Sequence, residues 1–192
     1  MNFASYADFR NGFLTLLTGD SATDGALDFG QTELLIQAGE DRVYNGDALN
    51  GGLRARTMLS TEALPIVSGV AALPAGFIEM ASGEVDGNAL EVVPNAYKGA
   101  GIRMAGDGLH VDGASLSLTY YKRPAALSAG LHSTFQRYPM LFLYGALVEG
   151  ADFLSLPAKD RWEKKFIDLL RAANRQERVA AFNGGSARIR SR

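Results

Sequence analysis

The chain has 192 residues, of which 47% are hydrophobic and 21% are charged, and its formal net charge is −2. This profile predicts a soluble globular protein with a buried core, and it excludes a disordered or fibrous chain. The absence of cysteine excludes disulfides, thiolate metal sites and cysteine nucleophiles, and two histidines, His110 and His132, are too few to favour a histidine-based metal site. Neither a cofactor nor a metal is expected.

The first 50 residues predict two amphipathic helices. In residues 3–18 the apolar side chains recur every three or four positions, which is the period of one helix face. Residues 27–44 show the same pattern with Gly39 inside it, and we expect this glycine to weaken the helix by about 1 kcal/mol relative to alanine. The N-terminus lacks the basic and apolar regions of a signal peptide, which predicts a protein made in the cytoplasm.

Residues 54–122 predict antiparallel strands joined by tight turns. Asp86-Gly87 and Gly106-Asp107-Gly108 are hairpin turn signals between short apolar runs. In the segment ASLSLTYYKR, Leu116, Leu118 and Tyr120 alternate with polar residues, which indicates a strand with one buried face. A segment of this length suits a small sandwich or a curled sheet.

The helical period returns after Leu127 and predicts two more helices. Pro139 fits the first turn of a helix that reaches about Leu154 and is apolar nearly all round, so we expect it at the centre of the fold. Gly145, Glu149 and Asp152 interrupt its apolar run, which is too short to span a membrane. The last helix is expected from Lys159 to Phe182. Its inner stripe comprises Trp162, Phe166, Leu169, Leu170 and Ala173.

The predicted fold class is therefore α+β: a four-helix bundle-like core, an antiparallel β insert and an extended C-terminal arm. The expected boundaries are 1–53 for the N-terminal helices, 54–127 for the insert, 128–184 for the C-terminal helices and 185–192 for the arm.

Charge is unevenly distributed along the chain. Residues 1–158 carry 9 Lys/Arg and 17 Asp/Glu, whereas residues 159–192 carry 10 Lys/Arg and 4 Asp/Glu. A basic end on an acidic body indicates that the end meets an acidic partner, which is a nucleic acid, another protein or a neighbouring copy of the chain.

No motif for catalysis or nucleotide binding emerges. The glycine pairs match neither the phosphate-loop nor the dinucleotide pattern, and there is no nucleophile elbow. Glu149 and Asp152 share a helix face and suit either a carboxylate pair for glycoside hydrolysis or ion pairs with the basic last helix. Neither histidine has a defensible catalytic constellation, so we expect a binding or structural protein and not an enzyme.

Several segments together resemble the head-to-tail adaptor, or connector, proteins of tailed bacteriophages, prophages and gene transfer agents. They are LPAGFIEM, LSLTYYKRPAALS, YPMLFLYGALVEGADFL, RWEKKFIDLLRAANRQERVA and NGGSARIR, and the first two helices fit the same family. The resemblance implies a helical bundle with a β insert. It also implies a virion protein that forms a ring, usually of twelve copies, beneath the portal, where it extends the DNA channel and docks the tail.

The resemblance and the charge asymmetry together predict where partners bind. The expected partners are the portal ring, neighbouring copies of the chain, a tail or stopper protein, and DNA that passes without sequence-specific contact; no membrane is expected. The expected portal-binding arm comprises Ser186, Arg188, Ile189, Arg190 and Arg192. The expected subunit interface comprises Arg161, Lys164, Lys165, Arg171, Arg175 and Arg178. Two alternatives stay open: a peptidoglycan hydrolase that uses Glu149 or another carboxylate during phage entry, and a non-specific DNA-binding module that uses the basic end.

Overall fold

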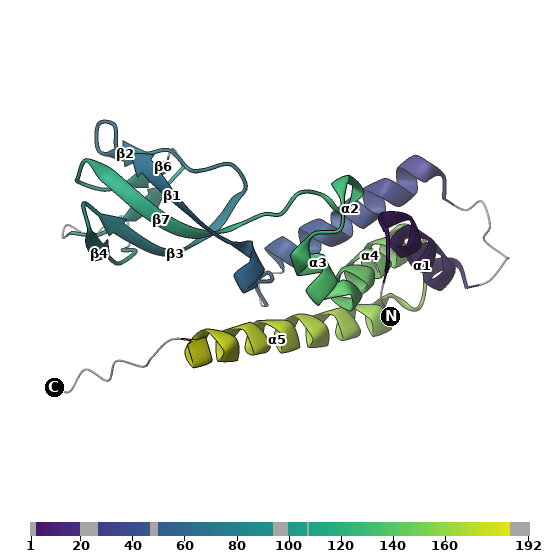
Figure 1. The fold of residues 1–192 in the computed structure, drawn as a ribbon. Coiled ribbons are helices and arrows are strands. Elements are labelled where there is room, and N and C mark those ends of the chain that lie inside the picture. Colours follow the sequence, from purple (N-terminus) through teal and green to yellow (C-terminus); the bar gives the residue numbers. More distant parts are fainter. Residues whose placement is uncertain (1–2, 20–26, 47–49, 94–99, 107, 185–192) are drawn as a thin grey trace. The chain divides into compact units, whose positions relative to one another are not determined.

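A computed structural model describes residues 3–19, 27–46, 50–93, 100–106 and 108–184. The chain divides into a helical unit, Met1–Thr57 with Pro124–Arg192, and a β unit, Met58–Arg123, which is inserted between its two halves. Figure 1 shows helices in the first unit and strands in the second. The predicted α+β class is confirmed.

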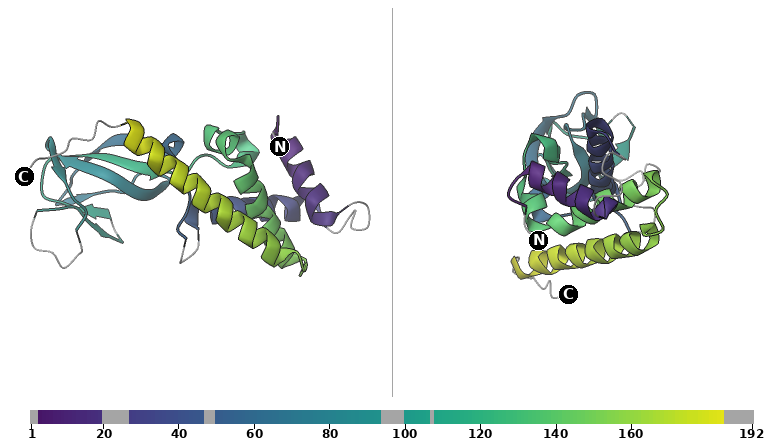
Figure 2. Two further views of the ribbon diagram at one scale, coloured as in Figure 1. Left: turned by 90° about the horizontal axis from the view of Figure 1, so that it is seen from below. Right: turned by 90° about the vertical axis from the view of Figure 1, so that its right-hand side faces the viewer.

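The helical unit contains the four predicted helices and one short additional helix. The helices are α1 (Tyr6–Thr18), α2 (Phe29–Asn45), α3 (Ser133–Arg137), α4 (Pro139–Phe153) and α5 (Lys159–Gly184), and single 3-10 turns cover Arg56–Met58 and Leu127–Ala129. Helix α4 packs against α1, α2 and α5, as Figure 2 shows. The prediction that this apolar helix is central is therefore confirmed.

Side-chain caps explain where the first two helices begin. The Ser5 hydroxyl accepts a hydrogen bond from the Asp8 N–H, which leaves α1 with one fewer unpaired donor. Asp28 and Gln31 form a reciprocal capping box at the start of α2. None of the helices within the described ranges has the combination of length and hydropathy that a bilayer span needs.

Helices α2 and α4 approach closely at two glycines. A Cβ atom on Gly39 would lie 2.4 Å from the backbone nitrogen of Ala146, and one on Gly145 would lie 2.9 Å from the carbonyl oxygen of Gly39. Real Cβ atoms do not reach such distances, so only glycine at position 39 permits this crossing. The helix propensity lost at Gly39 is offset by the backbone contact that it allows.

The β unit consists of two antiparallel sheets. Its strands are β1 (Leu59–Pro65), β2 (Val70–Ala71), β3 (Phe77–Val85), β4 (Asn88–Leu90), β5 (Arg103–Ala105), β6 (Gly108–His110) and β7 (Ser115–Lys122). One sheet has the order β1-β7-β3-β4 and the other β2-β6-β5. Side chains from both sheets form one core, which includes Leu109 of β6 and Leu118 of β7. The insert is therefore a small sandwich.

The alternation predicted in β7 and the turn predicted at Asp86-Gly87 are confirmed, whereas the second predicted turn, Gly106-Asp107-Gly108, includes Asp107, which lies outside the described residues. Leu116, Leu118 and Tyr120 of β7 are fully buried. Asp86 and Gly87 both have positive φ, 49° and 83°, and they connect β3 to β4. The Asp86 carboxylate also accepts backbone hydrogen bonds from Ala114 and Ser115, which lower its pKa and fix the turn against the start of β7.

Replacing Gly39 with alanine tests the close crossing of α2 and α4. We expect G39A to lower the free energy of unfolding by about 1–3 kcal/mol, because the new methyl group overlaps the α4 backbone. Urea titration followed by circular dichroism measures this change.

G30A is the matched control, because Gly30 lies in the same helix and its Cβ would approach only Asp28 Oδ1, at 3.4 Å. We expect G30A to leave stability unchanged or to raise it by up to about 1 kcal/mol. Equal stability of the two variants would contradict the role assigned to Gly39.

Candidate functional site

Helix α5 has one buried side, which packs on α4. Trp162, Phe166, Leu170 and Ala173 are buried there, as predicted, whereas Leu169 remains partly exposed. Glu177 continues the same side of the helix and is only 3% exposed. The periodicity therefore places the rest of the helix surface in solvent.

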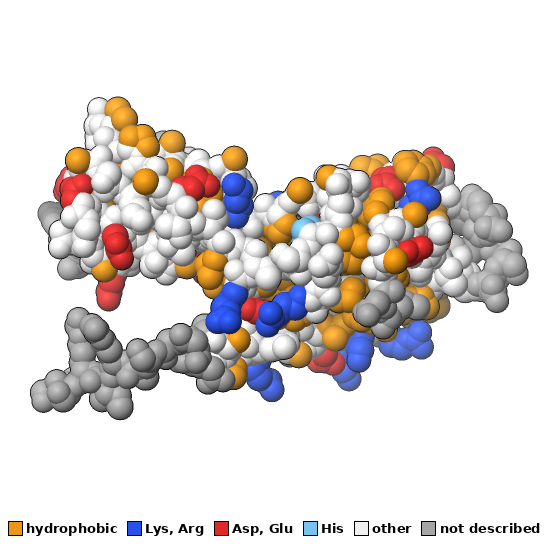
Figure 3. Space-filling model, in the orientation of Figure 1, with side chains coloured by type: hydrophobic (Ala, Val, Ile, Leu, Met, Phe, Trp, Pro, Cys, Tyr) orange, Lys and Arg blue, Asp and Glu red, His pale blue; other side chains and the backbone are white. Residues whose placement is uncertain are grey.

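The six cations predicted at the subunit interface lie on the solvent side of α5. Arg161, Lys164, Lys165, Arg171, Arg175 and Arg178 are all exposed. At 3.6 residues per turn they occupy an arc of about 140°, and at 1.5 Å per residue they extend over about 26 Å. We call this surface the basic face. Figure 3 shows Lys and Arg side chains gathered on the side of the helical unit where α5 lies.

Most cations of the basic face have no acidic partner within the described part of the chain. Arg171 donates a hydrogen bond from Nε to Asn50 Oδ1 at 2.9 Å. No ion pair joins Arg161, Lys164, Lys165, Arg175 or Arg178 to another described residue. Their charges are therefore available to a partner outside the described structure.

One end of the basic face borders a hollow of about 340 Å³. It is lined by Tyr144, Arg161, Trp162, Lys164, Lys165 and Asp168. Aromatic walls with three cations suit a carboxylate or phosphate group carried on an apolar stem. In the described ranges, no group of three or more His, Asp or Glu side chains has the geometry of a metal site.

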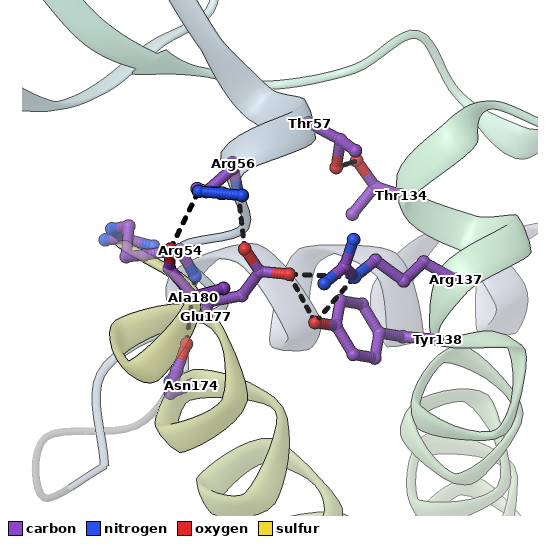
Figure 4. Close-up of polar contacts among 9 residues, drawn as sticks. All are labelled: Arg54, Arg56, Thr57, Thr134, Arg137, Tyr138, Asn174, Glu177 and Ala180. Carbon is purple, nitrogen blue, oxygen red and sulfur yellow. Dashed lines mark hydrogen bonds and ion pairs between the residues drawn. The ribbon is translucent and has the colours of Figure 1, made fainter. Parts of the chain in front are cut away.

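A second polar cluster surrounds Glu177 and is entirely within the helical unit. Glu177 accepts hydrogen bonds from the Arg56 N–H at 3.0 Å and the Tyr138 hydroxyl at 2.5 Å, and Arg137 Nε lies 2.9 Å from its carboxylate. Burial and the hydrogen bond to Glu177 raise the pKa of Tyr138. Figure 4 shows these groups converging on Glu177. The cluster fixes the segment before the β insert to α5.

Other contacts hold the two segments that flank the insert. Asn174, one turn before Glu177, accepts a hydrogen bond from the Arg54 N–H at 3.0 Å and donates one to the Gly52 carbonyl at 3.2 Å. After the insert, the buried Glu40 of α2 accepts a hydrogen bond from the Leu127 N–H at 2.8 Å. Sequence reasoning missed Glu40, Asn174 and Glu177, because a lone polar residue in a helix looks the same whether it is solvated or buried.

The two carboxylates of the pair on α4, Glu149 and Asp152, each bind a cation. Glu149 accepts a hydrogen bond from Arg42 Nε at 2.5 Å, and Arg42 also lies 3.4 Å from Glu163. Asp152 pairs with Lys159, and this hydrogen bond lowers the Asp152 pKa. Each acid thus neutralises a cation on a different helix. Only Asp152 pairs with α5, because α2 supplies the partner of Glu149.

Both histidines belong to defined secondary structure, His110 to a strand and His132 to the start of a helix. His110 lies in β6 opposite Val70 and Arg103. His132 caps α3: its Nδ1 accepts a hydrogen bond from the Phe135 N–H at 3.1 Å, and its Nε2 lies 3.0 Å from the Tyr44 hydroxyl. Burial lowers the pKa of His132. The cap needs an unprotonated Nδ1, so the ring is neutral with its proton on Nε2.

The residues predicted for the portal-binding arm, Ser186, Arg188, Ile189, Arg190 and Arg192, lie outside the described residues.

The helical unit thus exposes a long basic face on α5, whose cations other than Arg171 have no ion-pair partner among the described residues, and such a surface is typical of one that binds another molecule. The chain belongs to the family described as SU10 adaptor protein, which it matches over residues 4–190. The resemblance to phage head-to-tail adaptors is thereby confirmed, and it makes the protein a structural adaptor of a bacteriophage virion. No curated protein matches the chain.

Removing the Glu177 carboxylate tests the cluster of Figure 4. We expect E177A to lower the free energy of unfolding by about 2–3 kcal/mol, because the Arg56 N–H and the Tyr138 hydroxyl lose a charged acceptor. Urea titration measures the change. E163A removes a half-exposed carboxylate from the same helix, and we expect a loss below about 1 kcal/mol. Similar losses in both variants would contradict the anchoring role.

His132 predicts a dependence of stability on pH. Because its pKa is lower in the folded protein than the value of about 6.5 in an unfolded chain, the stabilisation is present above that value and is lost as pH falls through the folded pKa. We expect the urea midpoint of the wild type to fall between pH 7.5 and pH 5. H132N keeps a capping oxygen without a titrating ring, so the fall becomes smaller.

The control for this experiment is H110N, which removes the other histidine and leaves the cap intact. H110N keeps the hydrogen bond from the Phe135 N–H to His132, so the contribution of His132 to the pH dependence should persist in this variant. An H132N variant whose midpoint falls as far as that of the wild type would show that other groups cause the effect.

Proposed function

We propose that the protein assembles as a ring of twelve copies beneath the portal, where it extends the DNA channel and docks the tail through a tail or stopper protein. The match to the adaptor family over residues 4–190 carries this proposal. The protein would be made in the host cytoplasm and would act in the virion at the interface of head and tail, with no covalent chemistry of its own.

The charges of the molecule support a ring. A closed ring of identical copies needs two different surfaces on each copy that mate head to tail. The basic face of α5 is one such surface, because its cations are exposed and most have no acidic partner among the described residues. The acidic remainder of the chain, with 17 Asp/Glu in residues 1–158, supplies the opposite sign. Complementary charges set register and speed association.

We propose that the C-terminal arm binds the portal through Ser186, Arg188, Ile189, Arg190 and Arg192. The arm follows α5 and carries three arginines in its last five residues. Guanidinium groups pair with carboxylates in a fixed two-pronged geometry, so a short arm gains specificity from a few contacts. Twelve such arms on one ring bind together, and the ring is then held far more tightly than any single arm.

The DNA that passes through the channel would make no sequence-specific contact. The described helices carry none of the motifs that read base edges, and the aromatic residues Trp162 and Phe166 of α5 are buried against α4 and cannot stack on bases.

Deletion of residues 185–192 tests the role of the arm. We expect binding to purified portal rings, measured by pull-down, to fall at least tenfold, because every arm in the ring is lost at once. The variant R188A/R190A/R192A, which keeps the arm length, should lose a similar amount if the charges carry the contact.

The control is a matched circular dichroism melt, which should be unchanged because α5 ends at Gly184. Undiminished pull-down by the deletion variant would refute the arm as the portal contact. Binding that survives the arginine substitutions but not the deletion would assign the contact to the backbone and Ile189 instead.

A further inference from the structure

The hollow at one end of the basic face combines aromatic walls with a charged rim. Tyr144 of α4 is half-buried and Trp162 of α5 is 8% exposed, and both line this space of about 340 Å³. Its three cations have no acidic partner among the described residues, and Asp168 adds one acceptor to the same rim. A ligand that satisfies all of these groups carries an apolar side chain, an anionic group and an N–H donor close together.

The start of α2 presents these three kinds of group within three successive residues. Phe29 leaves most of its ring in water, because it is 67% exposed. The neighbouring Asp28 is also exposed; its Oδ1 accepts the Gln31 N–H, and no donor from the described residues reaches its Oδ2. The N–H groups of Phe29 and Gly30 belong to the first turn of α2, where the helix itself supplies no acceptor. The groups that the hollow lacks are therefore together at the start of α2.

The ring of Phe29 is held in place although it is exposed. The guanidinium group of Arg10 lies 4.8 Å from the ring centroid and covers one face of the ring. Arg10 is in turn 3.9 Å from the carboxylate of Glu33, which also accepts a hydrogen bond from the Tyr6 hydroxyl. A side chain that is already oriented loses less conformational entropy when it binds, so Phe29 is suited to a docking role.

Another exposed phenylalanine in the described ranges also follows an acidic residue, but its surroundings differ. Phe153 is 56% exposed, and the preceding Asp152 is engaged in the ion pair with Lys159. Phe29 therefore combines an exposed aromatic ring with a neighbouring carboxylate that no described cation neutralises.

Phe29 and the hollow are two different surfaces of the helical unit. Phe29 does not line the hollow of its own chain. Helix α4 packs against both α2 and α5, and Figure 1 shows the start of α2 and the start of α5 at separate edges of this unit. A contact between two different surfaces of identical copies is the head-to-tail relation that a closed ring requires.

We infer that Phe29 of one copy inserts into the hollow between α4 and α5 of the next copy. The inference rests on the proposed ring and identifies two surfaces that mate in it. The Phe29 ring packs beside Trp162 and Tyr144, which is the kind of buried aromatic contact that dominates interfaces. The Asp28 carboxylate pairs with the cations at the rim. Asp168 accepts hydrogen bonds from the first N–H groups of α2, where the helix dipole also favours a negative charge.

Truncation of Phe29 tests the contact. We expect F29A to form about tenfold fewer rings on purified portal than the wild type, counted by electron microscopy, because the apolar centre of the contact is lost. L34A is the matched control, since Leu34 belongs to the same helix and is also 67% exposed. It should assemble like the wild type. Circular dichroism melts of both variants should match that of the wild type, because neither side chain is buried in the single copy.

Disulfide trapping gives a second measurement, which leaves Phe29 in place. The chain has no cysteine, so a disulfide between G30C and K165C identifies the contact without ambiguity. Lys165 lines the hollow, and Gly30 is exposed beside Phe29. We expect a crosslinked dimer when the two variants are mixed on portal under oxidising conditions, and none from either variant alone. The mixture of L34C and K165C is the control and should stay uncrosslinked.

The outcomes separate this contact from the proposed function. Wild-type protein that forms no ring on portal refutes the proposed function itself. Wild-type rings together with an F29A variant that assembles normally overturn only the insertion of Phe29. The insertion is also overturned if L34A fails as severely as F29A, or if L34C crosslinks to K165C as efficiently as G30C does, since the contact would then not be specific to the start of α2.

Discussion

Two buried carboxylates bind the chain on either side of the β insert, and the packing of these two segments in the helical unit depends on them. Glu177 accepts the Arg56 N–H before the insert, and Glu40 accepts the Leu127 N–H after it. A carboxylate removed from water is tolerated only where donors replace its hydration. The two glutamates therefore fix the points at which the chain leaves and rejoins the helices, and α5 and α2 become parts of one unit.

The helices were predictable because their apolar periodicity is long and regular. The centrality of α4 followed from its lack of a polar side, and the alternation in β7 predicted its buried residues. The short helix α3 was missed because its sequence runs into α4, and only the break at Tyr138 separates the two. The sheet order was also beyond reach, because the pairing of β1 with β7 joins residues about 60 positions apart and leaves no local signal.

For the candidate site, the sequence predicted the basic face and missed the polar cluster behind it. Charge and the helical period together place Lys164 and Arg175 in solvent, and the structure agrees. Neither property distinguishes Glu177, which is buried, from Glu163, which is half exposed, because burial depends on the neighbours that α5 acquires after folding. The close contact at Gly39 shows the same limit: a glycine that looks like a weak point in a helix is required where two backbones cross.

The pairing of β1 with β7 has a consequence for how this protein can change. The insert begins and finishes on neighbouring antiparallel strands, with Leu59 opposite Tyr121, so its two ends emerge about 5 Å apart. A gap of that size can be closed by a short turn. Because its two ends lie so close together, the sandwich can be removed, or replaced by another insert, without a change in the sequence of the helices.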